Sequence, residues 1–176
     1  AKEVLHGNEQ VASLLLVVFS VGAVTVTQQC EVLSRRHVEI GLVPLGAIGM
    51  SACILHLAFA PAIAAQGLEV AGFMAQPGAW RVVLDLAGIG LFAGFYVVPL
   101  FALIQSRTPR AELSRVIAGM NIQNALFIVS AAVTGIVLQR YLGFSIPQVF
   151  LLLSILNFLA LIYLMLLVPE FFMRFI

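Results

Sequence analysis

The chain has 176 residues and a net charge of +1; 62% of its residues are hydrophobic and only 10% are charged. Soluble domains are about 45–50% apolar and about 25% charged, so this composition excludes a soluble globular protein. A nucleic-acid surface needs Lys and Arg clustered on one face, and no such cluster occurs. We therefore expect membrane lipid as a partner and no nucleic acid.

Five apolar runs divide the chain, and each is long enough to cross a bilayer. About twenty apolar helical residues span a hydrocarbon core of roughly 30 Å. The runs lie at residues 10–30, 40–60, 80–104, 114–138 and 147–168. The sequence thus predicts an all-α fold, a polytopic membrane helical bundle with five transmembrane helices. The gap at 61–79 stays apolar enough to lie on the membrane surface or to fold back against the bundle.

The arginines fall mainly into alternate gaps. Arg35 and Arg36 follow the first run, and Arg107, Arg110 and Arg115 follow the third. The positive-inside rule assigns such gaps to the cytoplasm. Five spans then predict a periplasmic N-terminus and a cytoplasmic C-terminus, and we expect at least one further span upstream.

Polar residues at the end of the first run form a candidate latch. Glu31 precedes the paired Arg35 and Arg36, and these three residues are expected to hold the first two spans together on the cytoplasmic side. In the second run, His56 is a lone polar residue that we expect to be packed and satisfied. Cys53 there is interpreted as a small buried hydrophobic residue, so we expect no disulfide and no metal site.

The third run contains Asp85, which is the most costly residue of the chain to place in a membrane. An ionised carboxylate at mid-membrane costs about 2.5–3.5 kcal/mol on insertion scales. Arg81 lies four residues earlier on the same helical face, so one interpretation is a structural Arg81–Asp85 pair. The other is a role for Asp85 in a gate or a substrate cavity.

The same run is rich in residues that shape a helix. Gly90 and Gly94 have the spacing that allows two membrane helices to approach closely. Pro99 removes one backbone hydrogen bond and predicts a helix kink. After the run, Thr108 followed by Pro109 predicts the N-cap and first position of the next helix.

Two amides on one face of the fourth run are the other candidate cavity residues. Asn121 and Asn124 are three residues apart and share a helix face, whereas Gln123 points elsewhere. One interpretation is hydrogen bonding between helices, and the alternative is a cavity that offers amides to a lipid headgroup. Asn157 in the fifth run is a lone polar residue that we expect to be satisfied by packing.

Sequence motifs of catalysis are missing. No His is followed four residues later by Asp, and there is no Gly-x-Ser-x-Gly elbow, phosphate loop or spaced set of metal ligands. We therefore expect that this chain is not an enzyme by itself and that it holds no cofactor.

Four segments resemble the lysophospholipid transporter family of the major facilitator superfamily. Three are residues 38–46 (VEIGLVPLG), 94–105 (GFYVVPLFALIQ) and 121–126 (NIQNAL). The fourth, 168–175 (VPEFFMRF), resembles the junction of fused members, where the transporter runs into a glycerolipid acyltransferase and an acyl carrier protein synthetase. The resemblance implies a partial transporter domain over 1–176 that supplies the last five helices of a twelve-helix, alternating-access fold.

The resemblance also implies a function for the intact protein. It would move lysophospholipids across the bacterial inner membrane for reacylation on the cytoplasmic side, with an N-terminal transporter half and a possible fused acyltransferase as partners. Two alternatives remain open. One is a half-domain that only anchors a downstream acyltransferase, and the other is a transporter of different small solutes.

Overall fold

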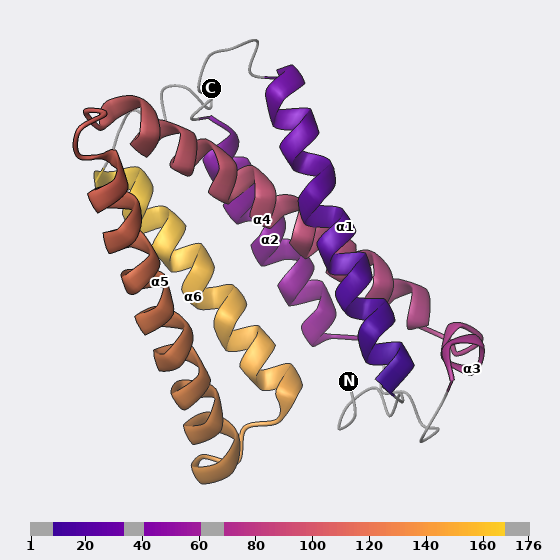
Figure 1. Cartoon of the computed structure of the whole chain (residues 1–176). Helices are drawn as coiled ribbons and strands as arrows, with labels where there is room; N and C mark the ends of the chain where they lie inside the picture. Colours follow the sequence, from indigo (N-terminus) through magenta and orange to yellow (C-terminus); the bar gives the residue numbers. More distant parts are fainter. Residues whose placement is uncertain (1–8, 34–40, 61–68, 168–176) are drawn as a thin grey trace.

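The computed structural model describes residues 9–33, 41–60 and 69–167, and for 27–33 only the backbone. The elements are α1 (Glu9–Leu33), α2 (Leu42–Ala58), α3 (Val70–Met74), α4 (Ala79–Arg107), α5 (Leu113–Ile136), the π-helical turn η1 (Val137–Tyr141) and α6 (Ile146–Leu167) (Figure 1). The described part of the chain contains no strand, which confirms the all-α prediction there. Each predicted run matches one long helix to within three residues at either end.

Within the described residues, four helices are long and apolar enough to cross a membrane, as a multi-pass membrane protein requires. They are α1, α4, α6 and the continuous helix made by α5 with η1. The second predicted span corresponds to α2, an apolar helix of 17 residues. At about 1.5 Å per residue, its length is roughly 25 Å, which is slightly less than a hydrocarbon core.

Helix α4 packs against both α1 and α2, and α2 in turn packs against α6 (Figure 1). Small residues make the α1 contact possible. A Cβ atom added at Gly90 would collide with the carbonyl oxygen of Phe19, and one added at Gly94 would lie 2.8 Å from the Cβ atom of Val26. The prediction that Gly90 and Gly94 allow a close helix approach is therefore confirmed.

The α2–α4 contact also depends on a glycine, which here belongs to α2 instead of α4. A Cβ atom added at Gly46 of α2 would lie 2.6 Å from the backbone nitrogen of Tyr96 and 2.7 Å from the carbonyl oxygen of Phe92. Backbone meets backbone on both sides of α4, so packing at short range holds these helices together. This is the main source of helix association in lipid, where the hydrophobic effect between helices is lost.

The short helix α3 folds back on the bundle. Phe73 is fully buried and belongs to an apolar cluster with Val11 of α1 and Val82 of α4. Gly78 follows with φ 93°, a left-handed conformation that glycine adopts without steric cost, and the chain turns there into α4. The described end of the 61–79 gap therefore packs against the helices.

The helix that follows α4 begins later than the sequence predicts. Thr108 is the C-cap of α4, and its hydroxyl donates to the carbonyl oxygen of Ile104 over 2.7 Å. A turn from Pro109 to Glu112 comes next, and α5 begins at Leu113. The N-cap prediction for Thr108 is wrong because its side chain hydrogen-bonds backwards instead of to the following turn.

Polar side chains join α2 to α6. Asn157 donates from Nδ2 to the Ser51 hydroxyl over 2.8 Å and to the Ala47 carbonyl oxygen over 3.2 Å. Ser154, which is buried, donates to the Ser51 carbonyl oxygen over 2.9 Å. The expectation that Asn157 is satisfied is confirmed, and these bonds give the α2–α6 contact its register.

Replacement of Asn157 by leucine is expected to lower the thermal unfolding midpoint of the purified protein in detergent. Hydrogen bonds between membrane helices contribute about 0.6 kcal/mol on average and up to about 1.7 kcal/mol, and Asn157 makes two. Gln123→Leu is the matched control because Gln123 is an exposed amide on α5. Equal midpoints for the two variants would contradict the assignment of Asn157 to the α2–α6 contact.

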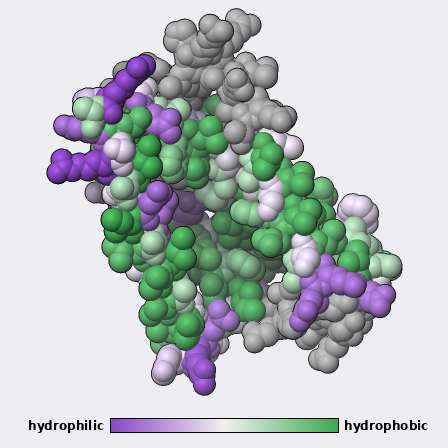
Figure 2. Space-filling view, in the orientation of Figure 1, coloured by the Kyte–Doolittle hydropathy of each residue, from purple (hydrophilic) through white to green (hydrophobic). Residues whose placement is uncertain are grey.

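No residue of α5 is buried against the rest of the described chain. Large apolar side chains such as Ile122, Phe127 and Ile128 are more than 60% exposed. Figure 2 shows this helix as an apolar surface between hydrophilic ends. In its second half the hydroxyls of Ser130 and Thr134 donate to the carbonyl oxygens four residues earlier. An exposed apolar surface whose mid-helix hydroxyls are bonded within the helix is suited to lipid or to a further helix.

Candidate functional site

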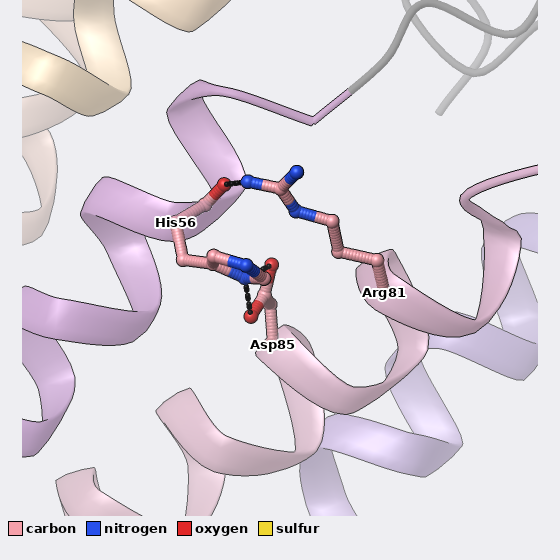
Figure 3. A network of polar contacts seen from close by, with 3 residues as sticks. All are labelled: His56, Arg81 and Asp85. Carbon is pink, nitrogen blue, oxygen red and sulfur yellow. Dashed lines mark hydrogen bonds and ion pairs between the residues drawn. The ribbon is translucent and has the colours of Figure 1, made fainter.

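A polar cluster lies where the end of α2 meets the start of α4, and it contains His56, Asp85 and Arg81 (Figure 3). The Nδ1 atom of His56 is 2.7 Å from Oδ1 and 2.9 Å from Oδ2 of Asp85. One nitrogen thus faces both carboxylate oxygens. The contact joins residues from two helices that glycine packing already holds close together.

The two partners differ in burial. The side chain of Asp85 is 9% exposed, whereas that of His56 is 56% exposed. An ionised carboxylate can only accept hydrogen bonds, so we assign a proton to Nδ1 of His56. The arrangement therefore combines a buried acceptor with a donor ring that extends to the surface.

Arg81 does not pair with Asp85. Its Nη2 atom donates instead to the carbonyl oxygen of His56 over 2.7 Å. The last carbonyl groups of a helix lack intrahelical donors, and the negative end of the helix dipole attracts a cation, which explains why the guanidinium reaches the end of α2. The predicted Arg81–Asp85 pair is wrong, because the carboxylate is taken by His56. In the described part of the chain, Arg81 Nε is buried without a hydrogen-bond partner.

The structure changes the interpretation of His56 as well. The sequence predicted a packed and satisfied residue, and His56 is satisfied by Asp85 but more than half exposed. The sequence does contain a signal that predicts the His56–Asp85 contact. His56 lies five residues before the gap at 61–79 and Asp85 six residues after it, so both lie at similar depth on consecutive long helices.

Asn121 and Asn124 are both exposed on α5, and the side chain of neither makes a hydrogen bond to another described residue. The interpretation that they bond between helices thus finds no support among the residues described. The structure does not bring them together with Asp85 either, because the main contact of α5 is with η1. Each is left as an amide on a largely apolar helix.

The side chain of Glu31, and all of Arg35 and Arg36, lie outside the described residues, so the latch stays a prediction. Pro99 is buried inside α4. Its ring nitrogen cannot donate to the Phe95 carbonyl oxygen, and the kink stays a prediction as well.

Apolar grooves run between neighbouring helices of the described bundle. One of about 370 Å³ runs between α2 and α6 and is lined by Ile48, Leu55, Ile155, Phe158 and neighbouring small residues. Another, of about 390 Å³, runs between α1 and α4 around Gly22 and Gly88. Such surfaces fit hydrocarbon and offer few groups for catalysis.

Comparisons with protein-family models, with curated proteins and with solved structures gave no match. Within residues 9–33, 41–60 and 69–167, no group of three or more His, Cys, Asp or Glu side chains is arranged to hold a metal ion. The features of this chain that bear on its function are therefore its helices, its polar cluster and its exposed amides.

Proposed function

We propose that the chain is part of a transporter that moves lysophospholipids across the bacterial inner membrane by alternating access, for reacylation on the cytoplasmic side. The observation that carries this proposal is the pair of exposed amides, Asn121 and Asn124, which share one face of a largely apolar helix. A polar amide in lipid needs a partner, and the headgroup of a substrate supplies one. The segments that resemble lysophospholipid transporters support the choice of substrate.

In this proposal α2 also spans the membrane, as the second of five spans in chain order, and local thinning of the bilayer accommodates its short length. Arg107 at the end of α4, Arg110 in the turn that follows and Arg115 at the start of α5 lie on the cytoplasmic side. The end of α2 and the start of α4 are then periplasmic. The chain corresponds to the last five helices of a major facilitator transporter, and the other transporter half covers α5.

The two ends of a lysophospholipid have different requirements. Asn121 and Asn124 donate amide protons to its phosphate or glycerol oxygens. Its single acyl chain lies along an apolar groove such as the one between α2 and α6, which is lined by Ile48, Leu55 and Phe158. Rocking of the two halves exposes the headgroup site to each side in turn.

Uptake of labelled lysophosphatidylethanolamine into vesicles that contain the full-length protein tests this assignment. A hydrogen bond to a charged group contributes about 1.5–3 kcal/mol, so Asn121→Ala and Asn124→Ala are each expected to slow uptake roughly tenfold or more. Gln123→Ala is the matched control, because its amide lies on a different face of α5. It is expected to transport normally.

The other outcomes separate the alternatives. Normal uptake by both asparagine variants would remove these residues from the substrate path. Transport of unrelated small solutes in preference to lysophospholipids would indicate a different substrate class. No transport by the wild-type protein, with membrane attachment of a downstream acyltransferase retained, would indicate an anchor.

A further inference from the structure

The His56–Asp85 contact has chemistry that the transport proposal leaves unused. Nδ1 of His56 donates to the two oxygens of Asp85, which leaves Nε2 of the same ring without a proton when the imidazole is neutral. The side chain of His56 is 56% exposed and lies in the last turn of α2, so water at the membrane surface reaches the ring when α2 spans the bilayer. A proton can therefore bind to or leave Nε2 while the bond from Nδ1 to Asp85 stays in place.

We propose that His56 and Asp85 form a proton-binding site that fastens the end of α2 to the start of α4. A proton from water at this end of the bundle forms a bond to Nε2, and the ring becomes an imidazolium. The hydrogen bond from an uncharged ring to the Asp85 carboxylate then becomes an ion pair, and the buried carboxylate gains a compensating positive charge. Loss of that proton to water returns the weaker hydrogen bond.

The groups around the pair favour this assignment. Asp85 of α4 is the carboxylate that contacts His56 among the described residues, and its charge also acts on the Cys53 thiol of α2. Arg81 of α4 is the nearby cation, but its Nη2 is bound to the His56 carbonyl oxygen.

The other helices contribute fewer charged groups near His56. Glu9 of α1 and Glu69 before α3 lie near the same end of the bundle, where α1, α3 and α4 share an apolar cluster. Helix α6, which packs on α2, has no charged residue. Among the described residues, Asp85 is therefore the carboxylate placed to balance a positive charge on the His56 ring.

The consequence for transport rests on the proposed function. The pair would then lie at the periplasmic end of the pathway, where protonation holds α2 and α4 together and deprotonation lets them separate. Acidification of the periplasmic side is expected to favour the closed outer end.

Distance measurements between spin labels on the full-length protein test the proton site directly. Phe59, at the end of α2, and Trp80, at the start of α4, are both more than 60% exposed and accept labels after replacement by cysteine in a background without other cysteines. The distribution of distances is expected to be shorter and narrower near pH 5 than near pH 8. His56→Gln and Asp85→Asn should each abolish this change.

His6→Gln and His37→Gln are the matched controls, because they remove the other histidines of the chain and should leave the change intact. A pH-dependent distance that persists in His56→Gln would overturn the proposal, and so would an unchanged distance in a folded wild-type protein. Uptake measured on the same samples keeps the two proposals apart. Intact uptake without the distance change removes only the proton site, and the distance change without uptake removes only the transport function.

Discussion

Gly90→Ala is expected to destabilise the protein, whereas Gly119→Ala is expected to leave its stability unchanged or slightly higher. A Cβ atom at Gly90 meets the Phe19 carbonyl oxygen, and backbone cannot move aside as a flexible side chain does. One added at Gly119 meets nothing within 4 Å. Overpacking costs about 1–3 kcal/mol, which outweighs the gain in helix propensity of about 1 kcal/mol from alanine when the α1–α4 contact must shift as a whole.

Thermal unfolding midpoints of the purified variants in detergent measure this effect. Gly22→Ala provides an independent variant from the other helix, because a Cβ atom there would collide with the Ala87 carbonyl oxygen of α4. We expect the unfolding midpoints of Gly22→Ala and Gly90→Ala to decrease by similar amounts. The midpoint of Gly119→Ala should equal that of the wild type. If all three midpoints agreed, α1 and α4 would not be in backbone contact in the protein.

The second large effect is expected from His56→Ala, which leaves Asp85 buried without its donor. A buried acceptor that loses its partner costs about 1–3 kcal/mol, and more when it is charged. Asp85→Ala removes the buried carboxylate itself. The double variant is therefore expected to be less destabilised than the two single changes added together, with a coupling energy of about 0.5–3 kcal/mol.

A double-mutant cycle on unfolding free energies gives that coupling. The control cycle combines His56→Ala with Ser154→Ala, because Ser154 contacts α2 through Ser51, away from the polar cluster. The changes in unfolding free energy of this second pair should be additive. Additive behaviour of His56→Ala with Asp85→Ala would mean that the two side chains do not interact in solution.

The helices of this protein were predictable because their signals are local. Run length and hydrophobicity located all five long helices, and the spacing of Gly90 and Gly94 indicated the close approach to α1. Such features depend on residues within one helix. These features are the same whichever helices become its neighbours.

The polar partners were less predictable because they depend on which helices become neighbours. Arg81 and Asp85 share a helix face, yet packing of α2 brings His56 to the carboxylate and turns the guanidinium to the end of α2. The N-cap prediction for Thr108 was wrong for a related reason. A local capping pattern allows the threonine hydroxyl to bond either to the following turn or to the preceding one, as it does here. For Asn121 and Asn124, no rule within the sequence decides what lies opposite an exposed helix.

The central place of α4 has a consequence for how the protein is made. Helix α1 leaves the ribosome before α4 exists, and at about 5–20 residues per second its partner is completed only about 4–15 s later. During that interval the face around Gly22 has lipid as its neighbour, and Asp85 is not yet present to receive His56. Membrane insertion of α1 and α2 must therefore succeed without the contacts that α4 later provides, and completion of α4 sets the time at which these three helices can assemble.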